Sequence, residues 1–352
     1  MAIPKINITA VYSLHCFYNY IWAMKKKIAL VTGGFTGESV VSFKSSAFVE
    51  SQLDYEKYEV YKIIVLKERW YHEDKNLNKY DIDRNDFTLK IGEGFISFDA
   101  VFIMIHGSPG EDGKLQGYFD MLNIPYTSCD ALTSSVTMNK AYSKAIVEGI
   151  KDLYIANSVQ LFDNTGKNLD LNLGSLKLPL FIKPNNGGSS IGMSKVKSSS
   201  ELPDALAKAF KKDTQVLVEE FIQGREFSVG VYNGKNGITV LPATEVIPSN
   251  DFFDFEAKYT PGATEEITPG RMNEEEKARV VQIVKDIYIR LNCRGMVRID
   301  YFLQDNTGNF YFIEINTIPG QTAQSFIPQQ VKAAGMNIGD FYGELIEKAL
   351  EN

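Results

Sequence analysis

Two short segments near the C-terminus combine acidic and amide side chains at a spacing suited to binding a metal ion. One residue separates Arg298 from Asp300, and one residue separates Glu314 from Asn316. Alternate residues of a strand share a face, so two paired strands would bring both carboxylates and the amide together, with Ile313 turned toward the core. Such oxygen atoms are the ligands that Mg²⁺ prefers, often beside a bound nucleotide. The pattern predicts a magnesium site.

The register of these two strands decides whether the carboxylates meet. Direct pairing of Asp300 with Glu314 requires an odd-numbered loop, which residues 305–309 would supply, or else a bulge that shifts the register. The alternative to a metal site is an exposed, salt-bridged sheet face. That alternative explains Asn316 poorly, because the surrounding apolar residues mark half-buried strands.

A small, flexible loop follows a predicted strand that ends at Lys183. Gly187 and Gly188 let backbone N–H groups converge on phosphate oxygens, and Ser189 adds a hydroxyl donor. The loop is not a P-loop, because Met193 stands where that motif requires lysine. A hairpin tip would explain the glycines alone, but the lysine at the strand end favours a nucleotide site.

Residues 219–226 and 251–270 could complete such a nucleotide site. The first segment places acidic residues at the junction of two predicted strands, where backbone groups could bind an adenine edge and a carboxylate could accept ribose hydroxyls. Taken singly, these acids are more typical of a solvated turn than of a binding site. The second segment is long and contains glycine and proline, which is typical of an active-site lid or a disordered excursion. Its aromatic residues, among them Phe253 and Tyr259, favour the lid.

The elements that must position these residues begin with apolar, β-branched runs in the N-terminal third. Strands are predicted at 27–32, 60–66 and 99–106, and a helix at 38–52. Continuous apolar strands that alternate with helices indicate a parallel sheet covered on both faces. Ligands of such sheets lie beyond the strand C-termini, where glycine-bearing turns follow at 33–37 and 107–113. Tight turns alone would also explain these glycines.

The pattern changes near residue 130, where helices mix with hairpin-like strands. Helices are predicted at 139–149, 201–210 and 273–291, and strands at 180–183, 193–196, 215–219, 226–232, 296–303 and 310–316. The last helix has Asn273 as its N-cap and Glu276 to complete a capping box. The chain is therefore predicted to be α+β, an open α/β domain followed by mixed-sheet domains.

The composition excludes several classes of protein. The chain has 352 residues, of which 44% are hydrophobic and 23% charged, so a disordered chain is excluded. A net charge of −7 argues against a dedicated nucleic-acid binder. Three widely spaced cysteines give neither a disulfide framework nor a CxxC motif, which indicates the reducing cytoplasm. With three histidines, zinc chemistry is not expected.

The N-terminal segment differs from the rest of the chain. Residues 6–24 contain no Asp, Glu, Lys or Arg, a length that could span a bilayer. Polar residues such as Asn7, His15 and Asn19 interrupt it, and no cleavage site follows. Met24 directly precedes the first predicted strand. We therefore expect residues 1–23 to be a dispensable extension, and we expect no membrane partner.

Together these segments resemble the D-alanine–D-alanine ligases of the ATP-grasp superfamily from residue 24 to the end. The matching segments follow the family's order: His106-Gly, Gly110–Gly117, Met138–Lys140, Lys183–Ser194, Glu256–Tyr259, Arg298–Asp300 and Glu314–Gly320. The resemblance implies an ATP-grasp fold preceded by an open, Rossmann-like parallel α/β domain. The implied divisions are an N-terminal domain at 24–128, a central subdomain at 129–220, and a C-terminal subdomain at 221–352 that carries the metal site and the lid 251–270.

The resemblance implies a nucleotide site with metal ions. The implied ATP-binding residues are Lys140, Lys183, Glu219, Glu220, Ile222, Glu226 and Lys258. Lys140 and Lys183 would hold the α- and β-phosphates, and Lys258 would come down with the lid onto the γ-phosphate. Glu219 and the backbone of the next three residues would receive adenine, and Glu226 the ribose. The implied ligands of two Mg²⁺ or Mn²⁺ ions are Asp300, Glu314 and Asn316.

The resemblance also implies an amino-acid site. Its implied catalytic and substrate-binding residues are Glu38, His106, Ser189, Tyr259, Arg298, Gly320 and Ser325. Glu38 and His106 would contact the first D-alanine, and Ser325 with the Gly320 backbone would contact the carboxylate of the second. Ser189 would link Glu38 to Tyr259 across the closed site. Arg298 would stabilise the developing oxyanion.

Three departures from the family pattern concern the same site. Ser39-Val40 follow Glu38 where the family usually has an Arg-Glu pair, and Gln321 and Gln324 replace an expected Met and His. Packing around the second substrate is therefore expected to differ. Tyr259, a neutral phenol at pH 7, would not repel an ammonium, so D-alanine is expected as the second substrate and D-lactate is expected to be barely used.

The implied activity is ATP- and Mg²⁺-dependent ligation of two D-alanines through D-alanyl phosphate, for peptidoglycan precursor synthesis. The implied enzyme is a cytoplasmic homodimer. The alternatives are a D-alanine–D-lactate or D-alanine–D-serine ligase and, in a different class, a non-catalytic nucleotide sensor. A sensor would be expected to have lost metal ligands or lysines, and this chain retains them.

Overall fold

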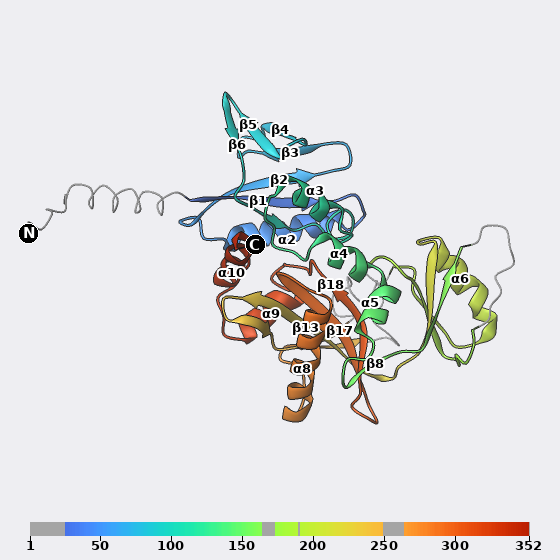
Figure 1. The fold of residues 1–352 in the computed structure, drawn as a ribbon. Coiled ribbons are helices and arrows are strands. Elements are labelled where there is room, and N and C mark those ends of the chain that lie inside the picture. The colour runs from blue at the N-terminus through green and yellow to red at the C-terminus, as the bar shows by residue number, and fades with distance from the viewer. Residues whose placement is uncertain (1–24, 164–172, 189–190, 249–263, 352) are drawn as a thin grey trace, which may run out of the picture.

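The computed structural model describes residues 25–163, 173–188, 191–248 and 264–351. Within these ranges the chain forms three β-sheets with helices packed against and between them (Figure 1). The predicted extension 1–23 lies outside the described residues, as does most of the predicted lid. None of the described helices combines the length and the apolar character that crossing a membrane requires.

The N-terminal sheet has the strand order β6-β5-β4-β3-β2-β1-β7. Its parallel part confirms the prediction and consists of β1 Lys26–Gly33, β2 Tyr58–Val65 and β7 Ala100–Ile103. Four antiparallel strands that were not predicted extend this sheet: β3 Trp70–Glu73, β4 Lys79–Asp83, β5 Thr88–Ile91 and β6 Gly94–Ile96. Their short connections permit only antiparallel pairing. These strands lack the continuous apolar runs that marked the others, as the largely exposed β4 shows.

Two helices cover the parallel part of this sheet, and they come from opposite ends of the chain. Helix α2 Ser39–Gln52 packs against β1 and α10 Ile338–Leu350 packs against β7 and α2 (Figure 1). Phe341 and Tyr342 of α10 are fully buried in the core that contains the strand residues 28–31. The C-terminal helix therefore returns to the N-terminal sheet and couples the two ends of the chain.

The second sheet is antiparallel, with the strand order β11-β10-β12-β9. Its strands are β9 Ser158–Phe162, β10 Leu180–Pro184, β11 Ser194–Val196 and β12 Gln215–Glu220. After a short 3₁₀ turn at Ser199–Glu201, helix α6 Leu202–Phe210 packs against β10, β11 and β12. Pro203 occupies the first turn of α6, as predicted, where its missing N–H has no cost.

The third sheet has the strand order β16-β15-β13-β17-β18-β8, and β14 pairs with β13. Its strands are β8 Leu153–Ile155, β13 Gly224–Gly234, β14 Gly237–Val240, β15 Thr244–Pro248, β16 Thr264–Ile267, β17 Met296–Gln304 and β18 Phe310–Asn316. Helix α8 Glu274–Arg290 packs on β13 and β14, and its predicted capping box between Asn273 and Glu276 is present. The remaining helices are α3 Lys114–Leu122, α4 Ala131–Met138, α5 Lys140–Val147 and α9 Phe326–Ala333.

A bulge sets the register between β17 and β18. Asp300 faces Glu314 and Arg298 faces Asn316, but the register shifts directly after Asp300. The alternative of a bulge is therefore confirmed, and the odd-numbered loop at 305–309 is wrong, because Leu303 pairs with Phe310 across six residues. The extra residue is Ile313, which lines a cavity instead of turning to the core as predicted.

Candidate active site

One cavity of about 530 Å³ lies where the three sheets meet. Every predicted site residue that the structure describes lines it: Glu38, His106, Lys140, Lys183, Glu219, Glu220, Ile222, Glu226, Arg298, Asp300, Glu314, Asn316, Gly320 and Ser325. The other three predicted residues, Ser189, Lys258 and Tyr259, lie outside the described residues. The structure thus brings together side chains that are separated by almost 290 residues in the sequence.

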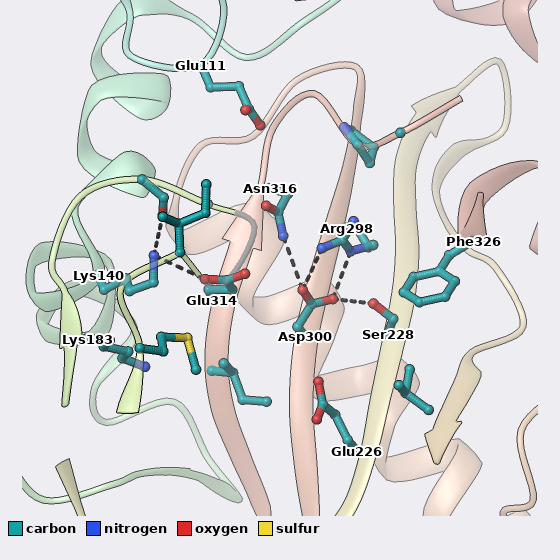
Figure 2. Close-up of a pocket in the computed structure, with 18 of the residues that line it drawn as sticks. Glu111, Lys140, Lys183, Glu226, Ser228, Arg298, Asp300, Glu314, Asn316 and Phe326 are labelled. Carbon is teal, nitrogen blue, oxygen red and sulfur yellow. Dashed lines mark hydrogen bonds and ion pairs between the residues drawn. The ribbon is translucent and has the colours of Figure 1, made fainter. Parts of the chain in front are cut away.

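Strands β17 and β18 hold a group of polar side chains against one wall of this cavity (Figure 2). Arg298 donates two hydrogen bonds to Asp300, from Nε at 2.9 Å and from Nη2 at 2.7 Å. Ser228 also donates to Asp300, and the Asn316 amide donates to it at 3.2 Å. Burial opposes the charge of Arg298, but the adjacent Asp300 raises the pKa of the guanidinium above its ordinary value. Arg298 therefore remains a fixed cation at the cavity wall.

The donor chemistry of this wall fits a hard cation. Asp300 and Glu314 are paired directly across the strands and Asn316 lies on the same face, so oxygen donors converge from two adjacent strands. Both carboxylates already attract cations, because Arg298 binds Asp300 and Lys140 Nζ lies 3.2 Å from Glu314 Oε2. Among the described residues no cluster of three or more His, Cys, Asp or Glu could hold a metal ion. Any bound ion would thus rely on these two carboxylates, the amide and ligands from the substrate.

Lys140 is placed by the junction between α5 and the loop after β10. Asn139 caps α5, and the backbone N–H groups of Lys140 and Ala141 donate to the carbonyl and side-chain oxygens of Asn185. Lys140 Nζ in turn donates to the Gly187 carbonyl at 2.5 Å. The helix and the glycine-bearing loop are therefore fixed to each other, with the lysine between the loop and Glu314.

A lysine that the sequence reasoning missed lies beside the two predicted phosphate lysines. Lys144 lines the cavity and pairs with Glu219 Oε1, while Lys183 Nζ lies 2.6 Å from Glu219 Oε2. Burial and the charge of Lys140 lower the pKa of Lys183 to about 7. Burial, with the charges of Lys183 and Lys140, also lowers the pKa of Lys144. The position of Lys144 four residues after Lys140 on a predicted helix was the available signal.

His106 is held in one tautomer by two neutral hydrogen bonds. Its Nδ1 lies 2.8 Å from the Ile318 carbonyl oxygen, which can only accept, so Nδ1 carries the proton. Its Nε2 then accepts from the Ser45 hydroxyl at 2.9 Å, and Ser45 accepts from the Gln321 N–H at 3.1 Å. Burial lowers the pKa of His106 to about 4, so the imidazole is neutral at pH 7.

Glu38 lies against glycines of two loops. A Cβ at Gly107, whose φ is +69°, would lie 2.4 Å from Glu38 Oε2, and one at Gly188 would lie 3.4 Å from Oε1. Only glycine therefore leaves room for the carboxylate at Gly107. This contact supports the interpretation of the turn 107–113 as part of a binding site, because the turn shapes the cavity as well as reversing the chain.

Glu111 is a second carboxylate that the sequence reasoning did not select. It lines the cavity above Glu314 and Asn316 (Figure 2) and accepts a hydrogen bond from the Gly107 N–H at 2.7 Å. Burial and the nearby charge of Glu38 raise the pKa of Glu111 to about 8. Its place in the Gly110–Gly113 turn was the available signal, because the whole turn follows a strand end.

Of the two glutamines predicted to alter the packing around a second substrate, one lines the cavity and the other is buried in the core. Gln324 lines the cavity. Gln321 is fully buried, donates to the Pro319 carbonyl at 3.1 Å and accepts from the Tyr342 hydroxyl at 2.8 Å. It therefore joins the loop after β18 to helix α10. Nearby, the Thr322 N–H donates to Ser325 Oγ at 2.9 Å, which fixes the loop that carries Gly320.

The chain is similar to proteins of one family along most of its length. Residues 27–129 match the family model "D-ala D-ala ligase N-terminus" and residues 157–347 match "D-ala D-ala ligase C-terminus". The D-alanine–D-alanine ligase of Flavobacterium johnsoniae is 42% identical over 327 residues, covering 92% of this chain and 99% of that protein. The D-alanine–D-alanine ligase of Parabacteroides distasonis is 43% identical over 331 residues, covering 94% and 99%.

Solved structures share the same fold. The VanG D-Ala:D-Ser ligase from Enterococcus faecalis has a TM-score of 0.81 and 31% identity, and the match covers 93% of this chain and 100% of that one. The D-alanine–D-alanine ligase from Bacillus anthracis complexed with ATP has a TM-score of 0.73 and 29% identity, covering 93% and 98%. The expected ATP-grasp architecture is thereby confirmed.

Proposed function

The chain belongs to the D-alanine–D-alanine ligase family, and we propose that it joins two molecules of D-alanine with ATP to form D-alanyl-D-alanine for peptidoglycan precursors. The observation that carries this proposal is the convergence of the described site residues on one cavity. A cluster of lysines, a carboxylate wall and a neutral histidine are the groups that such a reaction needs within reach of each other.

The first step activates a carboxylate. A carboxylate oxygen of the first D-alanine attacks the γ-phosphorus of ATP, and ADP leaves as D-alanyl phosphate forms. Lys140 and Lys183 would offset the negative charge of the phosphates, and Lys258 on the proposed lid would contribute a third positive charge. Glu219 and the backbone of Glu220–Ile222 would bind adenine, and Glu226 would bind ribose.

Asp300, Glu314 and Asn316 are the proposed ligands of Mg²⁺ or Mn²⁺. Bound there, two such ions would supply positive charge to the phosphate oxygens and orient them. The chain's own contribution is to hold the two carboxylates next to each other, each already in contact with a cation, Arg298 and Lys140 respectively. Removal of divalent ions with a chelator is expected to stop turnover.

The second step forms the peptide bond. The second D-alanine, as a free amine, attacks the carbonyl carbon of D-alanyl phosphate, and phosphate leaves. Arg298 lies at the cavity wall as a permanent cation and would stabilise the oxyanion that develops. Neutral His106 with Glu38 would orient the first residue, and Ser325 with the Gly320 backbone would hold the carboxylate of the second.

The choice of second substrate is the part of this proposal that competes with a related activity, because the solved VanG relative is a D-Ala:D-Ser ligase. We propose an amino acid in preference to D-lactate, since the neutral Tyr259, oriented by Ser189 and Glu38, would not repel an ammonium. We propose D-alanine in preference to D-serine, since the D-alanine–D-alanine ligases compared above are 42% and 43% identical to this chain and VanG is 31% identical. Equal concentrations of D-alanine, D-serine and D-lactate should give mainly D-alanyl-D-alanine by mass spectrometry. Mostly D-alanyl-D-serine, or mostly the D-lactate ester, at pH 7 would contradict the assignment.

We further propose that the enzyme is a homodimer in the cytoplasm. Both statements rest on the family resemblance. Light scattering of the purified protein should give twice the mass of the 352-residue chain.

A further inference from the structure

The structure contains a buried ion-pair group with one member, Lys144, that neither the sequence reasoning nor the proposed mechanism uses. Lys144 of α5 and Lys183 of β10 contact opposite oxygens of the single Glu219 carboxylate. All three are nearly inaccessible, at 4%, 5% and 5% exposure, and all three line the cavity. Two lysine amino groups therefore share one carboxylate in a place with little solvent.

Lys183 has a second task if the cavity binds ATP. It is the penultimate residue of β10, just before the glycine-bearing loop, and Lys140 reaches the same loop through the Gly187 carbonyl. Repulsion between these two lysines is relieved by a polyanion, so the phosphates of a nucleotide would draw Lys183 toward them. If Lys183 were the only partner of Glu219, this shift would leave a buried carboxylate unpaired, which is strongly unfavourable.

We propose that Lys144 is a positioning residue that keeps the Glu219 carboxylate paired, so that Lys183 can turn its charge to the phosphates of the nucleotide. Lys144 acts through Glu219 and Lys183 and does not itself touch the phosphates. This inference rests on the proposed use of ATP. It separates the two lysines of Glu219 into a permanent partner on Oε1 and an exchangeable partner on Oε2.

The inference predicts a phosphate-dependent defect. In Lys144→Met, Lys183 would have to stay with Glu219, so ADP should bind at least tenfold more weakly. Adenosine lacks phosphates and should bind within about twofold of wild type, because Glu219 keeps one partner and the adenine slot keeps its shape. Calorimetric titration of the full chain with ADP and with adenosine measures both. Lys151→Met, in the exposed turn after α5, removes the same charge outside the cavity and should change neither affinity.

A second pair of variants tests the dependence on Glu219. In Glu219→Gln the carboxylate is absent, so no partner is needed when Lys183 turns to the phosphates. Adding Lys144→Met to this variant should therefore leave its ratio of ADP affinity to adenosine affinity unchanged. The ratio should thus fall only when the carboxylate is present. If Lys144→Met does not fold, Lys144→Gln, which retains a hydrogen-bond donor, is used in the same titrations.

The outcomes are distinguishable. An unchanged ratio in a folded Lys144→Met protein overturns the inference, and so does an equal loss of adenosine and ADP binding, which would give Lys144 a purely structural role. A ratio that falls equally in the Glu219→Gln background overturns it as well, because Lys144 would then contact the phosphates directly. A wild-type protein that binds neither ADP nor adenosine would contradict the proposed function itself.

Discussion

The side chains at the two ends of the cavity are positioned by different interactions, ion pairs at one end and neutral hydrogen bonds at the other. At the proposed nucleotide end, buried lysines pair with carboxylates, as Lys140 does with the half-buried Glu314 and Lys183 with the buried Glu219. At the proposed amino-acid end, His106 is neutral and is held by Ser45 and a backbone carbonyl. Buried ion pairs are sensitive to the loss of one partner, whereas neutral hydrogen bonds depend mainly on shape. The first end should therefore respond most to changes of charge, and the second to changes of geometry.

The largest expected effect comes from a change of charge alone. Asp300→Asn retains the shape of the side chain but removes the charge that faces Arg298 and that would hold the metal ions. Turnover should fall by about 1,000-fold or more, since catalysis of this kind is mostly electrostatic. Phosphate release with D-alanine, ATP and millimolar Mg²⁺ measures it.

Thermal unfolding of Asp300→Asn provides the control for this experiment. The residue contacts the cavity and leaves no core void when its charge is removed, so the variant should still unfold cooperatively. Activity equal to wild type would show that Asp300 does not bind metal and that the contrast between the two ends is misplaced.

An intermediate effect should come from geometry without any change of charge. Gly107→Ala would put a methyl group 2.4 Å from Glu38 Oε2 and should displace that carboxylate, which lowers kcat/KM for D-alanine by roughly 10- to 100-fold. The affinity for ADP should change little, because the nucleotide end is separate.

Gly92→Ala is the matched control for Gly107→Ala. Gly92 also has a positive φ, +62°, but a Cβ there would meet nothing within 4 Å. It introduces similar backbone strain, of about 1 kcal/mol or more, without touching the site. Equal losses of activity in the two variants would mean that strain, and not the displaced carboxylate, accounts for the effect.

The third expected effect concerns stability at low pH and not turnover. The pKa of His106 is about 4 in the folded protein against 6.5 for a free imidazole, so below pH 6.5 protons bind the unfolded chain more strongly than the folded one. The neutral histidine should therefore make unfolding about 3 kcal/mol easier as pH falls from 6.5 to 4. Urea unfolding of wild type and His106→Gln across this range measures the difference. The two curves should converge as pH falls, and parallel curves would contradict a neutral, buried His106.

Much of the fold followed from local patterns. The apolar runs of β1, β2 and β7 and the capping box of α8 are visible in the sequence because each reflects neighbouring residues only. The antiparallel strands β3 to β6 were missed, since short, half-exposed strands lack a distinctive period. The bulge at Ile313 could be stated only as an alternative, because register depends on how two strands meet.

For the site, the sequence determined which chemical groups are present. The carboxylates at 300 and 314, the strand-terminal Lys183 and the glycine-bearing turns are identifiable because spacing on a strand dictates a shared face. Resemblance to a family then ordered them along the chain. Lys144 and Glu111 were missed because their partners are about 70 residues away in the sequence. Lys144 pairs with Glu219, and the charge of Glu38 raises the pKa of Glu111.

Only the tertiary structure decided how these groups are charged and which of them share partners. The pKa of a lysine or a histidine depends on burial and on charges brought close by distant segments, and no local pattern encodes either. The same holds for Gln321, which a sequence comparison places near the second substrate but which packing against Tyr342 turns into a core residue. Residue types and spacing are local properties of the chain, whereas burial, partner and protonation are set by the packing of three sheets around one cavity.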